Sequence, residues 1–154
     1  MKKLAFISTL LLCSYTGVHY KVNYPVSLNQ KVLTEVPRPN YDSTMVNALI
    51  MVESSGNDNA YCKSEDAVGC LQIRRTMVRD INRILKRQGS EKRFKFKDRW
   101  IRSKSIEMFN IYCEYYNLQS PEVISRCWNG GPKGHKKKST RKYWDKVKSL
   151  LKIN

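Results

Sequence analysis

A single glutamate ends an apolar, helix-patterned stretch of the chain. The run LIMVESSG covers residues 49–56, in which Leu49 and Glu53 lie about one helical turn apart and Gly56 marks a stop. Burial disfavours the charged form of a carboxyl group, so a glutamate on an apolar face has a raised pKa and can donate a proton near neutral pH. Glu53 is therefore a candidate general acid. Periodicity alone equally allows a solvated glutamate at a frayed helix end, without a role.

The elements that must position Glu53 are mainly helical. Asp42 or Ser43 can cap the helix that carries it, and Thr76 and Ser120 can cap two later helices. Apolar spacing predicts helices over about 43–55, 76–88, 103–116, 121–129 and 140–151, and turn residues predict a β-hairpin or lobe within 57–73. The predicted fold is an α-rich α+β domain over residues 42–154, a bundle of about five to six helices with one small β-hairpin lobe.

The beginning of the chain has the layout of a secretory signal. Two lysines precede an apolar run from Leu4 to Cys13, which is shorter than the roughly 20 residues of a membrane span. We expect residues 1–18 to be a cleaved signal peptide, with an uncleaved membrane anchor or a lipid-modified Cys13 as alternatives. Residues 19–41 carry three prolines and predict an extended linker. The expected location is the periplasm, the cell envelope or the extracellular space, or a virion if a phage encodes the chain.

Loss of the leader leaves four cysteines in a chain sent to an oxidising compartment: Cys62, Cys70, Cys113 and Cys127. We favour two local disulfides, Cys62–Cys70 across a short hairpin and Cys113–Cys127 between neighbouring helices. Free buried thiols, which pack as small apolar groups, are the alternative. The chain has no CxxC motif and its two histidines lie far apart in the sequence, so we expect no metal and no cofactor. We expect a monomer.

The net charge of +16 indicates a polyanionic partner. Residues 132–148, PKGHKKKSTRKYWDKVK, hold eight lysines and arginines against one acid. In an exported chain this excess favours an anionic cell wall or membrane surface over nucleic acid, and the plainer alternative is a solvated helix face. Tyr143 and Trp144, at helical spacing from Val147, are predicted to point into the core.

Two separated segments resemble the soluble lytic transglycosylases. The first, VESSGNDNAYCKSEDAVGCLQI, has the helix-ending Glu-Ser, a glycine, a short lobe and the Gly-x-x-Gln-Ile element of that family. Its matching residues are Glu53, Ser54, Gly56, Gly69, Gln72 and Ile73. The second, RCWNGGPKG, is similar to the family's Ala-Tyr-Asn-Ala-Gly segment, with Asn129 and Gly131 matching. The resemblance covers about residues 42–151 and implies a lysozyme-like fold.

The resemblance also implies a reaction on the glycan strands of peptidoglycan. In the family, one glutamate protonates the β-1,4 bond between N-acetylmuramic acid and N-acetylglucosamine. The same carboxylate then takes a proton from the muramic C6 hydroxyl, and a 1,6-anhydro ring closes. Carried over to this chain, Glu53 is the acid and then the base, Gln72 and Asn129 bind substrate or shape the pocket, and Ser54 supports the carboxylate.

Departures from the family pattern keep alternatives open. Goose-type lysozymes, the hydrolytic relatives, usually carry an aspartate where this chain has Arg74, which favours the anhydro product. Hydrolysis requires a second carboxylate, and the candidates in the lobe are Asp58, Glu65 and Asp66, each of which can equally be a solvated turn residue. A muramidase and a non-catalytic wall-binding module of the same fold are the alternative functions.

Two further departures concern substrate contacts. Trp128 replaces the family's tyrosine, whose hydroxyl commonly sits near the catalytic acid. An indole can stack on a sugar and donate one hydrogen bond, so Trp128 either lines the cleft or packs in the core. The segment CLQIRR replaces the more usual apolar stretch around the glutamine. Arg74 or Arg75 in it either meets substrate carboxylates or is surface charge.

Overall fold

The computed structural model describes residues 43–153, so the leader predicted at 1–18 and the linker predicted at 19–41 lie outside the described residues. The five α-helices are α1 (Ser43–Ser54), α2 (Arg75–Arg87), α3 (Arg102–Tyr115), α4 (Pro121–Gly130) and α5 (Arg141–Leu151). One antiparallel sheet is formed by β1 (Tyr61–Cys62) and β2 (Ala67–Val68), and the 3₁₀ turns are η1 (Phe96–Trp100), η2 (Gly134–Lys136) and η3 (Lys138–Thr140). The predicted helix-rich fold with one small β element is confirmed. Among the described helices, none has the length and apolar character needed to cross a bilayer.

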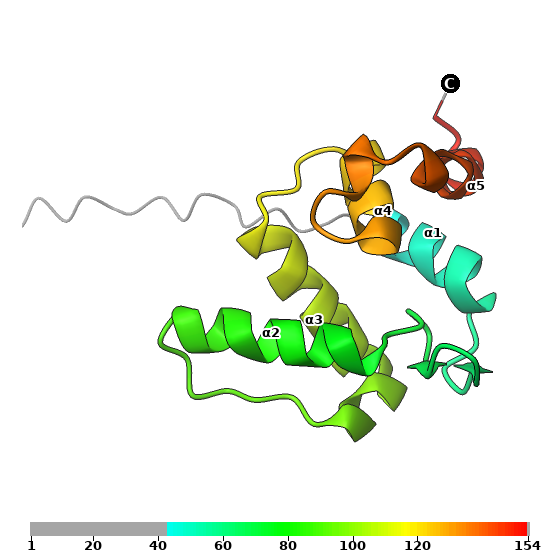
Figure 1. Cartoon of the computed structure of the whole chain (residues 1–154). Helices are drawn as coiled ribbons and strands as arrows, with labels where there is room; N and C mark the ends of the chain where they lie inside the picture. Colours follow the sequence, from blue (N-terminus) through cyan, green and yellow to red (C-terminus); the bar gives the residue numbers. More distant parts are fainter. Residues whose placement is uncertain (1–42, 154) are drawn as a thin grey trace, which may run out of the picture. The chain divides into compact units, whose positions relative to one another are not determined.

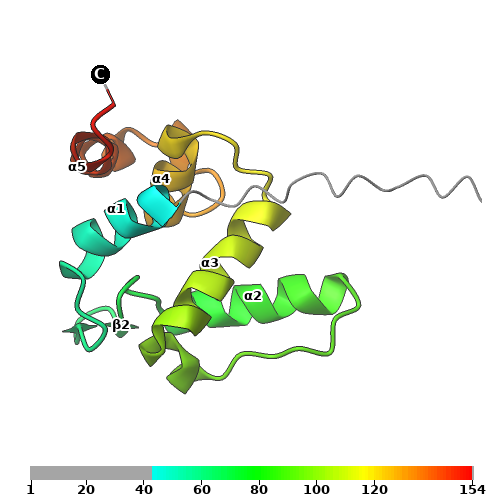
Figure 2. The ribbon, with the colours of Figure 1, turned by 180° about the vertical axis from the view of Figure 1, so that it is seen from behind.

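The helices form two groups that meet at the core. Helix α5 packs against α1 and α4, while α2 packs against α3, and the β-lobe joins the end of α1 to the start of α2 (Figures 1 and 2). The apolar face of α1 is buried, including Val46, Leu49 and Ile50, as the spacing predicted. Because Glu53 follows this face by one turn, the helix carries it to the edge of the core.

Helix boundaries follow the local signals closely, with one correction. Ser120 accepts a hydrogen bond of 3.3 Å from the Val123 amide, and Pro121 opens α4, as predicted. The prediction that Thr76 caps the second helix is wrong, because α2 begins at Arg75 and Thr76 lies in its first turn. No side chain caps this end, so the local cap signal did not mark the true start.

The β-lobe is stabilised by hydrogen bonds from a buried arginine in η1. The guanidinium of Arg99 donates hydrogen bonds to the carbonyl oxygens of Asp66, at 2.7 Å, and Ile73, at 3.0 Å. These two carbonyls lie before and after β2 in the sequence, so one side chain ties together the segments that flank this strand. Gly69 has a φ of +78°, and a Cβ atom there would lie 2.1 Å from the Arg99 carbonyl oxygen, so only glycine allows this approach.

Neither predicted disulfide is formed, and the four cysteines within residues 43–153 carry free thiols. The expectation that Cys62 and Cys70 face each other is wrong, because the hairpin register pairs Cys62 with Ala67 and places Cys70 beyond the strand. Cys113 and Cys127 are both fully buried, on α3 and α4. Burial raises the pKa of the Cys113 thiol, and the nearby Cys127 adds to the shift. The buried thiols therefore pack as small apolar groups, the alternative reading of the sequence.

Candidate active site

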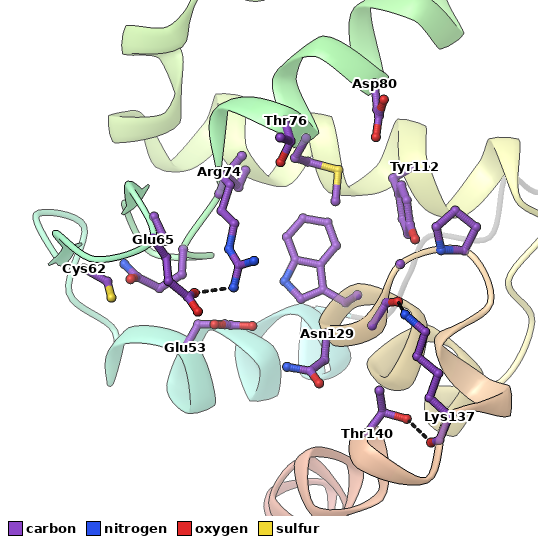
Figure 3. A pocket seen from close by; sticks show the side chains of 18 of the residues that line it. Glu53, Cys62, Glu65, Arg74, Thr76, Asp80, Tyr112, Asn129, Lys137 and Thr140 are labelled. Atoms are coloured by element: carbon purple, nitrogen blue, oxygen red, sulfur yellow. Dashed lines mark hydrogen bonds and ion pairs between the residues drawn. The ribbon is translucent and has the colours of Figure 1, made fainter.

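A cavity of about 850 Å³ runs between the lobe, the start of α2 and the end of α4, with Glu53 at its floor (Figure 3). The lobe supplies one wall and the segment 129–140 the opposite one. Its lining includes Glu53, Cys62, Glu65, Gln72, Arg74, Thr76, Met77, Asp80, Tyr112, Trp128, Asn129, Gly131, Pro132, Lys137, Ser139 and Thr140. The polar lining and the volume suit an oligosaccharide segment better than a small apolar ligand.

Glu53 lies in the last turn of α1, half-buried, with its carboxylate turned toward the cavity (Figure 3). Burial raises the pKa of Glu53 above its ordinary value, and the negative charge of Glu65 adds to the rise. A hydrogen bond from Tyr143, the positive charge of Arg74 and a hydrogen bond from Trp128 each lower that pKa. The net direction is upward, so Glu53 keeps its proton to a higher pH than a solvated glutamate.

The hydroxyl group beside Glu53 comes from Tyr143. It donates a hydrogen bond of 2.7 Å to Glu53 Oε1 from α5, which packs against α1. Burial, followed by the neighbouring Glu53 charge, raises the pKa of Tyr143, so its hydroxyl stays protonated and remains a donor. The sequence predicted Tyr143 only as a core residue. Its inward helical position was the available signal, but nothing local indicates a partner 90 residues away.

Trp128 performs both of the roles that the sequence left open. It is a buried residue that lines the cavity, and its ring packs edge-on against Phe109, with centroids 5.2 Å apart, and against Tyr112 at 5.8 Å. Its side chain also donates a hydrogen bond that lowers the pKa of Glu53. The aromatic packing holds the indole in place, and its N–H then supports the ionised carboxylate.

Gln72 and Asn129 line the cavity from opposite walls, whereas Ser54 does not line it. The Gln72 side-chain amide donates to the carbonyl oxygens of Ala60, at 3.2 Å, and Gly69, at 3.0 Å, so it braces the lobe that it lines. Asn129 is exposed to the cavity at the end of α4. The Ser54 hydroxyl donates to the Cys70 carbonyl oxygen at 2.9 Å, which ties the end of α1 to the lobe. Ser54 thus positions the helix end that carries the carboxylate.

The lobe acids are paired with arginines. Glu65, which lines the cavity, forms an ion pair with Arg74 beside Glu53 (Figure 3). The other pairs outside the cavity lining are Asp58 with Arg102 at 2.9 Å, and Asp66 with Arg75 at 2.6 Å and with Arg99 at 3.6 Å. Arg74 therefore lines the cavity, while Arg75 is held on the outer surface, where it also lies over the Phe96 ring. Within residues 43–153, no three histidine, cysteine or acidic side chains gather in a way that could hold a metal ion.

A family model of the transglycosylase SLT domain matches residues 33–150. The chain belongs to the transglycosylase SLT family. The resemblance seen in the sequence is thereby confirmed, and the helix-rich domain with its small sheet is the lysozyme-like fold of that family. SLT domains in general are peptidoglycan lytic transglycosylases, so peptidoglycan is the substrate class of the SLT domain described here. The match begins at residue 33, inside the segment 19–41 that the sequence predicted as a linker. No curated protein and no solved structure matches the chain.

Proposed function

We propose that this SLT domain cleaves the β-1,4 bond between N-acetylmuramic acid and N-acetylglucosamine and leaves 1,6-anhydromuramic ends, with Glu53 as acid and then as base. The observation that carries the proposal is the environment of Glu53. Its pKa is raised at the floor of a cavity large enough for a glycan segment, and a partly buried tyrosine donates a hydrogen bond to its carboxylate. A protonated carboxyl group in that position is what general acid catalysis requires.

The proposed reaction balances without water. Glu53 gives its proton to the glycosidic oxygen, and the bond from the muramic C1 atom to that oxygen breaks, leaving an oxocarbenium-like centre at C1. The Glu53 carboxylate then removes the proton of the C6 hydroxyl as O6 bonds to C1, which regenerates the acid. Tyr143 and Trp128 donate to the carboxylate in between, so they stabilise the ionised state that exists only during the reaction.

The pairing of the other cavity acids favours the anhydro product over hydrolysis. Hydrolysis needs a second carboxylate to act as nucleophile or to activate water. Of the remaining carboxylates that line the cavity, Glu65 is paired with Arg74, and Asp80 is paired with Arg83 at 2.5 Å. Both carboxylates are thus engaged by guanidinium groups, and neither is left without a partner to activate water.

We also propose that the protein acts outside the cytoplasm, since peptidoglycan lies there. The basis is the secretory layout of residues 1–18, which precedes the described domain.

The test is digestion of purified sacculi by the full chain and by Glu53→Gln, with mass spectrometry of the released muropeptides. We expect anhydromuramic ends from the wild type and a loss of at least about a hundredfold in rate for Glu53→Gln, the usual scale for a general acid. Glu91→Gln, an exposed acid away from the cavity, is the matched control and should keep full activity.

Three outcomes would contradict the proposal, each in a different way. Products with ordinary reducing ends would make the protein a muramidase. A fully active Glu53→Gln would remove Glu53 from the chemistry. Binding to sacculi with no released product in the wild type would make the domain a wall-binding module.

A further inference from the structure

One wall of the cavity continues into an exposed cluster of positive charge. The basic rim is defined here as Lys133, Lys136, Lys137, Lys138, Arg141 and Lys142, all exposed, within a stretch that contains no acid. Within residues 43–153, no ion pair involves a basic side chain of this rim. Elsewhere in the domain, several arginines are neutralised by acids, for example Arg75 by Asp66 and Arg102 by Asp58.

The arrangement of the rim opposes stability. Arg141 and Lys142 lie in the first turn of α5, where the helix dipole disfavours positive charge, and that turn contains no acid. The other rim lysines stand just before this turn, so like charges gather in a short stretch and take part in none of the ion pairs found within residues 43–153. Charge placed against both the dipole and its neighbours is better explained by an external anion than by the needs of the fold.

The fold nevertheless holds the rim firmly against the active site. The buried guanidinium of Arg126, on α4, donates to the Lys137 carbonyl oxygen and to Thr140 Oγ1, both at 3.1 Å. The Thr140 hydroxyl in turn donates to the Gly134 carbonyl oxygen at 2.8 Å. Lys137 and Thr140 line the cavity themselves (Figure 3). A glycan strand leaving the cavity on this side therefore passes the rim.

We propose that the basic rim binds the carboxylates of the stem peptides carried by the peptidoglycan strand whose glycan occupies the cavity. The inference rests on the proposed function for its substrate. It adds a second, electrostatic binding surface, which selects peptide-bearing glycan over bare glycan. Continuity with the cavity wall favours this partner over nucleic acid or an anionic membrane, since neither of those is delivered to the rim by the reaction.

The test measures binding to sacculi by co-sedimentation in a Glu53→Gln background, so that no substrate is consumed. The rim variant is Lys136→Glu, Lys138→Glu and Lys142→Glu, which leaves the cavity-lining Lys137 intact. The matched control is Lys86→Glu, Lys95→Glu and Lys97→Glu, which makes the same change of charge at exposed positions away from the cavity. A corresponding triple-glutamine rim variant separates loss of charge from charge reversal, and thermal unfolding of each variant checks that the domain is folded.

We expect the rim variant to bind sacculi about tenfold more weakly at low ionic strength and the control to bind as before, because local charge and not net charge is responsible. The difference in binding between the rim and control variants should vanish at about 0.5 M salt, where screening shortens the reach of exposed charges to a few ångströms. Glycan strands stripped of their peptides by an amidase should bind the rim variant and its parent equally.

Several results would overturn the proposal. They are an equal loss in the rim and control variants, an unchanged rim variant, and a rim effect that persists on peptide-free glycan. A rim effect confined to double-stranded DNA or to vesicles of anionic lipid would assign the surface to that other partner. Because the binding assay uses an inactive background, its failure is distinguishable from failure of the proposed reaction, which is judged only by the muropeptides that the wild type releases.

Discussion

At the scale of single residues, the proton on Glu53 is governed by four neighbours from four parts of the chain. Tyr143 on α5, Trp128 on α4 and Arg74 before α2 favour the ionised carboxylate, while Glu65 in the lobe disfavours it. Burial outweighs the three that favour ionisation, so the pKa of Glu53 is raised. Because the neighbours come from different parts of the chain, substitutions can test each contribution separately.

Replacement of Tyr143 by phenylalanine should slow the reaction about tenfold to a hundredfold. The hydroxyl stabilises the carboxylate that forms after proton donation, and a hydrogen bond to a charged group contributes about 1.5–3 kcal/mol. Loss of the bond also raises the pKa of Glu53, so the decline in rate toward alkaline pH should move to higher pH. Rates of muropeptide release across pH measure both effects. A slower enzyme with an unmoved profile would limit Tyr143 to packing.

Substitutions of Glu65 and Arg74, which form an ion pair, should shift the alkaline limb of the pH–rate profile in opposite directions. Activity requires protonated Glu53 and is lost as the pH rises through its pKa. Glu65→Gln removes a charge that raises this pKa, so the limb should move to lower pH, whereas Arg74→Gln should move it to higher pH. The double variant should lie between the two. Shifts of equal sign in both single variants would contradict the electrostatic account.

At the scale of elements, the cavity wall formed by 129–140 depends on a close backbone approach. A Cβ atom at Gly134 would lie 1.9 Å from the Arg126 carbonyl oxygen, so η2 can pack on α4 only when this residue is glycine. The buried Arg126 then joins the two segments by hydrogen bonds to Lys137 and Thr140. The basic rim and the far wall of the cavity are both held by this one contact region.

Gly134→Ala should lower the free energy of unfolding by about 3 kcal/mol, because backbone would have to move on one side of a packed contact. Gly89→Ala is the matched control. Gly89 has a φ of +73° with open space around its missing side chain, so the change costs only the left-handed backbone strain, about 1–2 kcal/mol. Chemical denaturation of both variants measures the difference. A smaller loss at position 134 than at 89 would disprove the close approach.

At the scale of the whole molecule, charge is divided unevenly over the described domain. Arg75 and Arg83 on α2 and Arg102 on α3 each pair with an acid, whereas none of the ion pairs found within residues 43–153 involves the rim beside the cavity. The net charge alone predicted a polyanionic partner, and the sequence locates the most basic stretch at 132–148. The fold adds that part of this stretch, including Pro132, Lys137 and Thr140, lines the cavity that holds Glu53. The rim and control triple variants, which carry equal net charge, test that placement directly.

Much of this architecture could be predicted from local sequence. The apolar spacing of Val46, Leu49 and Ile50 predicted α1, and Ser120 with Pro121 predicted the start of α4, because such signals act within one helical turn. The motifs around Glu53, Gln72 and Asn129 indicated the family, and the family match confirmed it. These three residues line the cavity, as their resemblance to the family implied.

Contacts between distant segments required the tertiary structure. The hydrogen bond from Tyr143 to Glu53 joins two residues that are 90 positions apart in the sequence. The ion pair of Glu65 with Arg74 depends on how the lobe folds against the start of α2. The hairpin register, which sets Cys62 opposite Ala67, separated two cysteines that the sequence had placed together. The sequence by itself determined which helices form and which glutamate ends the first, because those depend on side chains one turn apart. Packing decided which groups surround that glutamate, because each of them comes from a different element.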